Sequence, residues 1–206
     1  MIEKHQIVGV VLAGGKASRM NFKDKALLSL GEIPLIEHVI ANAGSQVGSL
    51  VISVNRNPEK FRYLGLPLIA DFDQAYAGPL VGICSALKWM IARGAEPGSS
   101  YLACFPADVP WFPENLVQSL CHAIEPANVK VAWTKCNEQV QPLFSVWALD
   151  CLEMIEDEIR QGFYGPKLIM PKFDNVLVSF DQSEAGYFLN INTRENLLLA
   201  QKLIEK

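Results

Sequence analysis

Apolar runs of five or six residues recur along the first half of the chain, and polar or glycine-rich breaks separate them. Runs of this length that are rich in Val, Ile and Leu are typical of strands buried on both faces of a sheet. The pattern therefore predicts four buried strands, at residues 7–12, 50–54, 66–70 and 101–106.

Segments with helical periodicity lie between these strands. Pro34 suits the first turn of a helix, and the apolar residues from Ile36 to Ala43 recur at spacings of three and four. This pattern predicts a helix that ends at Gly44. Further helical segments are expected at residues 59–64, 80–92 and 113–123.

The alternation of strands and helices predicts an α/β fold with a Rossmann-like, open and mostly parallel twisted sheet and helices on both faces. Right-handed crossovers place the C-terminal ends of such strands at one edge, where ligands bind in open α/β sheets. The residues with useful chemistry that follow the predicted strands are Gly14, Asn55, Asp71 and Asp108. We therefore expect these four residues at one edge of the sheet.

The second half of the chain is less regular. The pattern predicts strands at residues 130–134, 142–148 and 176–180 and a helix at 150–160. A last helix is expected after Asn192 and Thr193, either of which can cap it. At 206 residues, the simplest expectation is one domain with a full hydrophobic core.

Composition and charge exclude several classes of protein. Half of the residues are apolar and 19% are charged, which is typical of a globular chain. The formal charge is −4 and no basic block is present, so nucleic acid is not expected as a partner. We expect no signal peptide, no membrane span and, from five scattered cysteines, a cytoplasmic location.

The first predicted strand runs into a stretch suited to phosphate. The glycine pair Gly14-Gly15 lets the backbone approach a ligand and aim N–H groups at its oxygens. The cations that follow this pair are Lys16, Arg19, Lys23 and Lys25. The spacing matches neither a P-loop nor a dinucleotide-binding fingerprint. Without further pattern, an ordinary strand-to-loop turn with surface lysines would explain the glycine pair equally well.

The wider pattern is more specific. Leu12-Ala13-Gly14-Gly15, Arg19-Met20 and Asp24-Lys25 resemble the signature of nucleotidyltransferases with a fold like that of nucleotide-diphospho-sugar transferases. Within that group, the chain resembles molybdenum cofactor guanylyltransferases of the MobA type. The resemblance implies transfer of GMP from GTP to the terminal phosphate of a molybdopterin-type cofactor, with release of pyrophosphate and with Mg²⁺ as cofactor.

The resemblance also implies an organisation and partners. Residues 1–125 are expected to form the nucleotide-binding half of the domain, and residues 126–206 the half that binds the acceptor substrate. Besides GTP and the molybdopterin-type cofactor, transient partners would be molybdoenzymes or other proteins of cofactor biosynthesis. We expect a monomer.

Roles for individual residues follow from the same resemblance. It implies that Lys25, Arg19 and Asp108 are catalytic and that Asp108 also binds the metal. Asn190 and Asn192, which match an N-x-N-T pattern before the last helix, are implied to contact the acceptor. The nucleotide-binding residues that it implies are Leu12, Ala13, Gly14, Gly15, Lys25, Asn55, Asp71 and Asp108.

Simpler roles are open for several of these residues. An aspartate in Asp108-Val109-Pro110 can stabilise a turn, Lys25 can be a solvated surface lysine, and Asn192 can be a helix cap. A turn role is also open for Asn55, although its amide offers the donor and the acceptor that recognition of a purine edge requires.

Other functions remain open as well. A related enzyme could use CTP or a sugar or polyol phosphate, although the glycine pair favours the guanylyl type. A non-catalytic nucleotide-binding protein is the alternative from a different class. It is motivated by departures from the family pattern at Asn21-Phe22, Ser53 and Gln141. An unrelated α/β domain is the third alternative.

Overall fold

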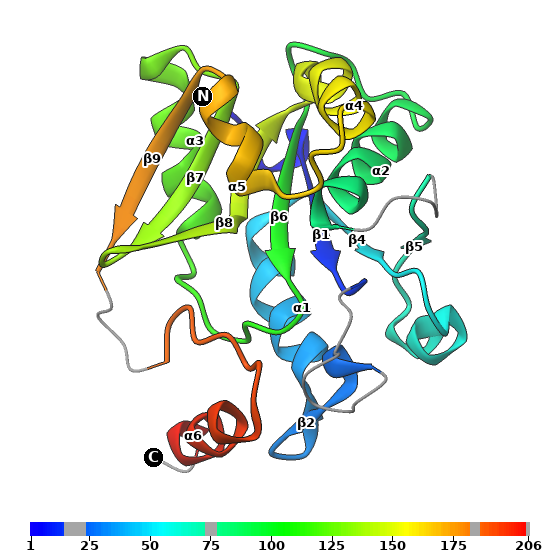
Figure 1. Ribbon diagram of the computed structural model, residues 1–206, viewed down its shortest axis with the longest axis vertical. Coiled ribbons are helices and arrows are strands. Elements are labelled where there is room, and N and C mark those ends of the chain that lie inside the picture. Colours follow the sequence, from blue (N-terminus) through cyan, green and yellow to red (C-terminus); the bar gives the residue numbers. More distant parts are fainter. Residues whose placement is uncertain (15–23, 73–77, 182–185, 205–206) are drawn as a thin grey trace.

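The computed structural model describes residues 1–14, 24–72, 78–181 and 186–204, and Figure 1 shows their arrangement around one sheet. Within these residues the sheet has seven strands in the order β5-β4-β1-β6-β8-β7-β9, and β2 and β3 form a separate hairpin. The strands are β1 (Ile7–Leu12), β2 (Ser29–Leu30), β3 (Ile33–Pro34), β4 (Ser49–Ser53), β5 (Leu68–Ile69), β6 (Tyr101–Pro106), β7 (Val131–Cys136), β8 (Gln139–Ala148) and β9 (Asn175–Phe180).

The sheet is mostly parallel. β1 pairs in parallel with β4 on one side and with β6 on the other, and β4 continues in parallel to β5. β8 is antiparallel to both β6 and β7, and β9 returns in parallel to β7. The predicted α/β fold is confirmed, and the less regular second half of the chain supplies the antiparallel part of the sheet.

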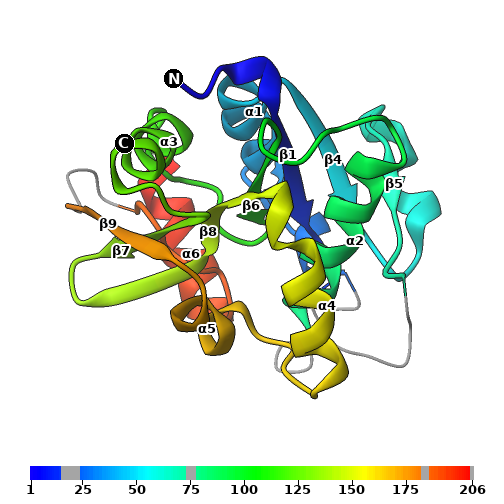
Figure 2. The same cartoon turned by 90° about the horizontal axis from the view of Figure 1, so that it is seen from above.

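Helices cover both faces of the sheet, as Figure 2 shows. One face packs against α1 (Leu35–Gln46) and α3 (Leu116–Ala127). The opposite face packs against α2 (Pro79–Ile91), α4 (Leu152–Arg160) and α5 (Pro166–Ile169). In β1, Val11 joins the first of these cores and Val10 the second, and both side chains are fully buried. Because successive side chains of a strand point to opposite faces, this strand must be apolar throughout.

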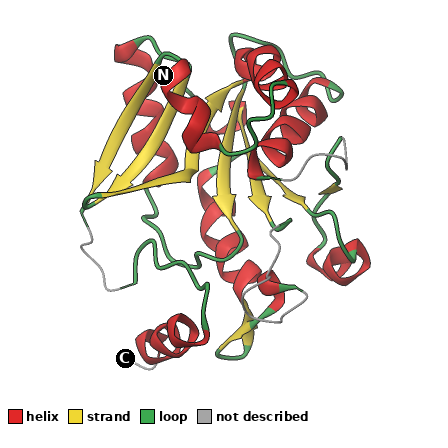
Figure 3. Cartoon of the chain, viewed as in Figure 1, coloured by secondary structure: helices red, strands yellow, loops and turns green. Residues whose placement is uncertain are grey.

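The C-terminal ends of β1, β4 and β6 point toward the hairpin and α6 (Arg194–Ile204) (Figure 3). Here Leu30, Leu35, Ile191 and Ala200 form a small buried cluster of their own. This cluster fastens the C-terminal segment to the part of the chain that follows Lys25. The 3-10 helices are η1 (Lys4–Gln6), η2 (Lys25–Leu27), η3 (Pro58–Leu64), η4 (Leu149–Cys151) and η5 (Met170–Lys172).

Some predicted boundaries are wrong. α1 continues past Gly44 to Gln46, whose side-chain oxygen accepts a hydrogen bond from the Val117 amide at 3.0 Å. A contact with another helix thus extends α1 beyond its sequence signal. α3 begins at Leu116 rather than at residue 113, and β5 covers only two of the five predicted residues.

The cysteines occupy the interior, as the sequence indicated. All five are free and buried, and burial raises the pKa of the Cys84, Cys104, Cys121 and Cys151 thiols to about 12. They are therefore small core residues rather than reactive thiols. Among the described helices, none is both long and apolar enough to cross a bilayer.

Candidate active site

The Lys25 side chain lies at the centre of the candidate site. Its Nζ atom is 2.5 Å from Asp108 Oδ2 and 3.2 Å from Asn190 Oδ1, and it also donates a hydrogen bond to Asn192 Oδ1. The side chain of Lys25 is 13% exposed and that of Asp108 is 25% exposed, so the pair is partly shielded from water. Lys25 is thus an oriented cation surrounded by oxygen atoms, not a solvated surface lysine.

Main-chain hydrogen bonds bring these distant segments together. The Ala107 amide donates to the Leu12 carbonyl at 3.2 Å, which places the start of the turn after β6 beside the end of β1. The Ile191 amide donates to the Asp108 carbonyl at 3.0 Å. Ile191 is fully buried while Asn190 and Asn192 on either side of it are exposed, and the side chains of both asparagines accept hydrogen bonds from Lys25.

The cap of α6 is Thr193 rather than Asn192. The Asn196 amide donates to Thr193 Oγ1 at 3.2 Å, which satisfies one of the free N–H groups at the start of the helix. The Asn192 side chain is engaged by Lys25 instead. Capping therefore does not explain the presence of Asn192.

The oxygen atoms around Lys25 are of the kind that bind a hard divalent cation. Asp108 supplies a carboxylate and Asn190 and Asn192 supply amide oxygens, and all three converge on one positively charged atom. The described part of the chain holds no group of three or more His, Cys, Asp or Glu side chains that could hold a metal. These residues fit a Mg²⁺ ion that takes its remaining ligands from phosphate oxygens and water, as Mg²⁺ commonly does.

A second group of residues lies at the ends of β4 and β5. Asn55 Nδ2 donates to Asp71 Oδ2 at 2.5 Å, and the Asp71 amide donates to Asn55 Oδ1 at 2.7 Å. A Cβ atom on Gly14 would be 3.2 Å from Asn55 Nδ2, so the backbone after β1 is in direct contact with this pair. The structure thus brings together Gly14, Asn55 and Asp71.

The carboxylate of Asp71 has one oxygen without a partner. Asp71 Oδ1 is buried and has no hydrogen-bond partner among the residues that the structure describes. Burial raises the pKa of the Asp71 carboxyl, and the hydrogen bond from Asn55 opposes this increase. A buried acceptor left unpaired costs stability, and ligands with N–H donors can pair with such an atom.

Position 53 does not belong to this group. Ser53 is 2% exposed, and a Cβ atom on Gly82 would be 2.9 Å from its Oγ atom. The side chain of Ser53 therefore packs against α2, while its carbonyl accepts a hydrogen bond from the Ala13 amide at 2.8 Å. The departure from the family pattern at Ser53 thus lies in the core.

Several predicted site residues cannot be placed. Gly15 and Arg19 lie outside the described residues, as do Lys16, Lys23 and the pair Asn21-Phe22. Leu12 and Ala13 lie at the end of β1, next to Gly14.

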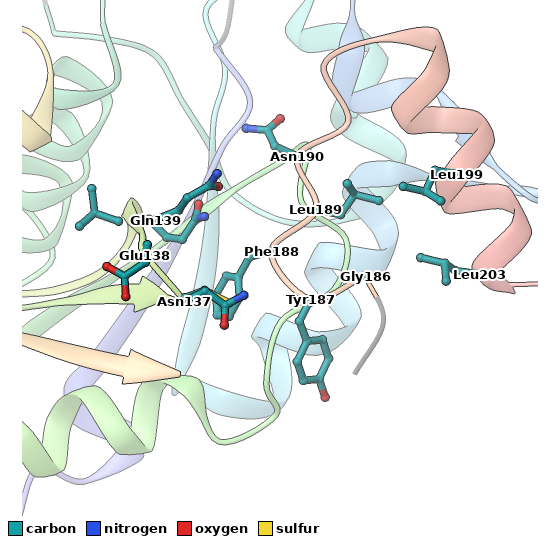
Figure 4. A pocket seen from close by; sticks show the side chains of 13 residues that line it. Asn137, Glu138, Gln139, Gly186, Tyr187, Phe188, Leu189, Asn190, Leu199 and Leu203 are labelled. Carbon is teal, nitrogen blue, oxygen red and sulfur yellow. The ribbon is translucent and has the colours of Figure 1, made fainter. Parts of the chain in front are cut away.

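A pocket of about 810 Å³ adjoins Asn190 (Figure 4). It lies between the β7–β8 turn and the segment 186–190, and Leu199 and Leu203 of α6 also line it. The residues of the turn and of β8 that line it carry mostly polar side chains: Asn137, Glu138, Gln139 and Gln141. Tyr187 and Phe188 add aromatic surface. The pocket and the surroundings of Lys25 share Asn190, whose side-chain oxygen accepts a hydrogen bond from Lys25 Nζ.

Sequence reasoning missed Asp24, although it is part of the Asp24-Lys25 motif. The Asp24 carboxylate accepts hydrogen bonds from Asn57 Nδ2 and Lys60 Nζ, which lie in the segment after β4. Only its position next to Lys25 in that motif could have singled it out, because its partners are more than thirty residues away.

The sequence of the chain is similar to a known protein family and to individual members of that family. Residues 9–170 match the family model for the MobA-like NTP transferase domain. The chain is 35% identical to the molybdenum cofactor guanylyltransferase of Ralstonia pickettii, over 96% of this chain and 97% of the relative. It is 32% identical to the enzyme of that name from Mesorhizobium japonicum, over 98% of each chain.

A solved structure shares the fold. Molybdopterin-guanine dinucleotide biosynthesis protein A from Archaeoglobus fulgidus superimposes with a TM-score of 0.74 and 21% identity, over 97% of this chain and 98% of that one. The similarity extends over nearly the full length of the chain.

Proposed function

Because the chain belongs to the MobA-like NTP transferase family, we propose that it is a molybdenum cofactor guanylyltransferase. It transfers GMP from GTP to the terminal phosphate of a molybdopterin-type acceptor and releases pyrophosphate. The observation that carries this proposal is the convergence of Asp108, Asn190 and Asn192 on the amine of Lys25. This arrangement joins a phosphate-binding cation to residues from both halves of the domain.

The base and ribose of GTP bind at the ends of β1, β4 and β5. The backbone of Leu12, Ala13 and Gly14 lines this part of the edge, and we assign Gly15, the next residue in the sequence, to the same ligand. Asn55 and the unpaired oxygen of Asp71 lie beside it. Guanine carries an exocyclic amino group that donates hydrogen bonds, and a carboxylate is an acceptor only. Asp71 therefore favours guanine over bases that present an acceptor at that position.

The phosphates lie near Lys25. A phosphate monoester is already a nucleophile, so the protein needs to align the two substrates and to stabilise negative charge rather than supply a general base. Lys25 donates hydrogen bonds to the reacting phosphate, and Asn190 and Asn192 hold its amine in position. Arg19 is the second cation that we assign to this step.

Mg²⁺ is the metal that fits the oxygen atoms present. Asp108 would be its protein carboxylate, with the amide oxygens of Asn190 and Asn192 next to it. When bound, the ion would offset the negative charge of the triphosphate.

The acceptor binds in the pocket beside Asn190. Its volume of about 810 Å³ lies within the range of roughly 300–1,000 Å³ that is typical of small-molecule sites. The amide side chains of Asn137, Gln139 and Gln141 can pair with the donors and acceptors of a pterin ring. Tyr187 offers an aromatic face to the same space. The shared residue Asn190 then lies between the acceptor and Lys25.

The proposal is tested by incubating the protein with molybdopterin, Mg²⁺ and each of GTP, CTP, ATP and UTP, followed by mass spectrometry of the pterin product. We expect a guanylylated product with GTP and little product with the other nucleotides. A cytidylylated product would instead identify a related transferase. Nucleotide binding without any product would identify a non-catalytic nucleotide-binding protein.

A further inference from the structure

The carboxylate of Asp24 is largely shielded from water, and Asp24 directly precedes the central lysine in the chain. Its side chain is 10% exposed, and its two oxygens lie 3.1 and 3.2 Å from Asn57 Nδ2. Lys60 Nζ lies 2.5 Å from Oδ2. A nearly buried carboxylate requires such partners, because desolvation disfavours an unpaired charge.

The partners of Asp24 come from the nucleotide side of the site. Asn57 follows Asn55 by two residues and has a left-handed backbone with φ of 49°, and Lys60 lies in η3. The Lys60 amide donates to the Asn57 carbonyl at 3.0 Å, so the two partners form one rigid turn. Asp24 therefore fastens the start of η2 to the segment that carries Asn55.

This attachment fixes the position of Lys25. The Asp24 carbonyl accepts a hydrogen bond from the Leu27 amide at 3.1 Å, which sets the backbone of η2 from its first residue. The Ala26 side chain is buried in the core and anchors the same turn. With the backbone held on both sides, the Lys25 side chain starts from a defined position, from which its amine contacts Asp108 and the two asparagines.

From these contacts we infer that Asp24 is a positioning residue, which acts through Asn57 and Lys60 to orient Lys25 without touching either substrate. This inference rests on the proposed function, in which Lys25 acts on the reacting phosphate. The Asp24–Lys60 pair is only partly buried, since the Lys60 side chain is 48% exposed, so it adds little net stability, but it can select one arrangement of the chain. Here that arrangement aligns the catalytic lysine with the segment that binds the nucleotide.

The experiment compares Asp24→Ala with a matched control, Glu158→Ala. The Glu158 side chain is 9% exposed and pairs with Lys172 Nζ at 2.5 Å, so it has nearly the burial and pairing of Asp24. Glu158 lies in α4, at the opposite end of the view in Figure 1 from β2, the strand that follows η2 in the chain. Both variants lose a comparable ion pair, and only Asp24→Ala releases η2. We expect kcat to fall roughly ten- to a hundredfold in Asp24→Ala, with the KM for GTP nearly unchanged, and to stay near the wild-type value in Glu158→Ala.

A second readout follows Lys25 itself. Acetylation of the Lys25 amine by acetic anhydride, measured by mass spectrometry of the digested protein, should be slow in the wild type and in Glu158→Ala. It should be several times faster in Asp24→Ala, because the amine leaves its three oxygen partners. This readout does not depend on the reaction catalysed. A wild type without transferase activity would refute the proposed function, and the labelling rates would still test the role of Asp24.

A further variant tests whether Asp24 acts on Lys25 through Asn57. Asn57→Gly removes the side-chain amide and keeps the left-handed backbone, because glycine adopts a positive φ without strain. If Asp24 acts through Asn57, the double variant that combines Asp24→Ala with Asn57→Gly loses no more activity than Asp24→Ala alone. Should Asp24→Ala fail to fold, Asp24→Asn keeps the size of the side chain and takes its place in every comparison. The inference is overturned if kcat and the labelling rate of the Asp24 variant both match those of Glu158→Ala.

Discussion

Lys25 Nζ and Asp108 Oδ2 lie 2.5 Å apart although 83 positions separate the two residues in the chain. Lys25 begins the turn that follows the glycine-rich stretch, and Asp108 follows β6. The pairing of β1 with β6 therefore forms the site, because it places the ends of these two strands side by side. Substitutions of the residues that meet at this edge of the sheet can therefore test the contribution of each contact to activity and to stability.

The carboxylate of Asp108 is expected to be essential for transfer. Asp108→Ala removes the carboxylate that faces Lys25 and that we propose to hold the metal, so turnover should fall to background. The side chain is 25% exposed and its loss leaves no large cavity, so the unfolding temperature should change by only a few degrees. Pyrophosphate release and circular dichroism measure the two effects. Normal turnover in this variant would refute the assignment of Asp108 as the metal ligand.

Asn192 and Thr193 are adjacent residues with separable roles. Thr193→Ala loses the cap of α6 and should lower the free energy of unfolding by about 1 kcal/mol, with transferase activity kept. Asn192→Ala loses a partner of Lys25 and should lower kcat with a smaller loss of stability. Urea unfolding and steady-state kinetics on both variants measure these effects. The reverse pattern would mean that Asn192 is the cap in solution.

Binding of guanosine should depend on pH through Asp71. Burial raises the pKa of this carboxyl, so it takes up a proton at a higher pH than an ordinary aspartate, whose pKa is about 3.9. The protonated form is a poorer acceptor, and binding should weaken as the pH falls through the raised pKa. Guanosine is the appropriate ligand because it has no phosphate that titrates. Calorimetry should show this pH dependence of guanosine affinity in the wild type. In Asp71→Asn, the affinity should be lower and should not change with pH. A flat response in the wild type would exclude contact between Asp71 and the base.

Two glycine substitutions should have different effects, one on nucleotide affinity and the other on stability. In Gly14→Ala the new Cβ lies 3.2 Å from Asn55 Nδ2, so Asn55 must shift and nucleotide affinity should fall. Gly44 lies in α1 with no atom within 4 Å of a built Cβ, so Gly44→Ala should stabilise the protein by about 0.5–1 kcal/mol without a change in affinity. Thermal unfolding with and without GTP measures both. Equal nucleotide affinity in the two variants would mean that the Gly14 backbone does not border the nucleotide.

Much of the fold could be predicted because the strands next to the site are apolar on both faces. β1 and β6 have the predicted boundaries, and the residues after them lie at the predicted edge. α1 shows where local pattern stops being sufficient, since the contact of Gln46 with Val117 extends it past Gly44. Such a contact depends on the packing of two helices and leaves no signal in either segment.

The candidate site was predictable in its residue types but not in its contacts. Lys25, Asp108, Asn190 and Asn192 could be named from the resemblance, and the structure brings them together. The choice of Thr193 over Asn192 as cap depends on side-chain orientation, which sequence does not contain. The partners of Asp24 likewise become visible only once β4 is placed beside β1.

The most direct test of the central claim is the rate of a single turnover in Lys25→Ala. Enzyme in excess over GTP is mixed with acceptor and Mg²⁺, and formation of the guanylylated product is followed in time, while the GTP dissociation constant is measured separately. The account predicts that the rate constant falls by at least roughly a hundredfold with GTP affinity changed far less, because Lys25 acts on the reacting phosphate. A wild-type rate constant combined with weakened GTP binding would contradict it.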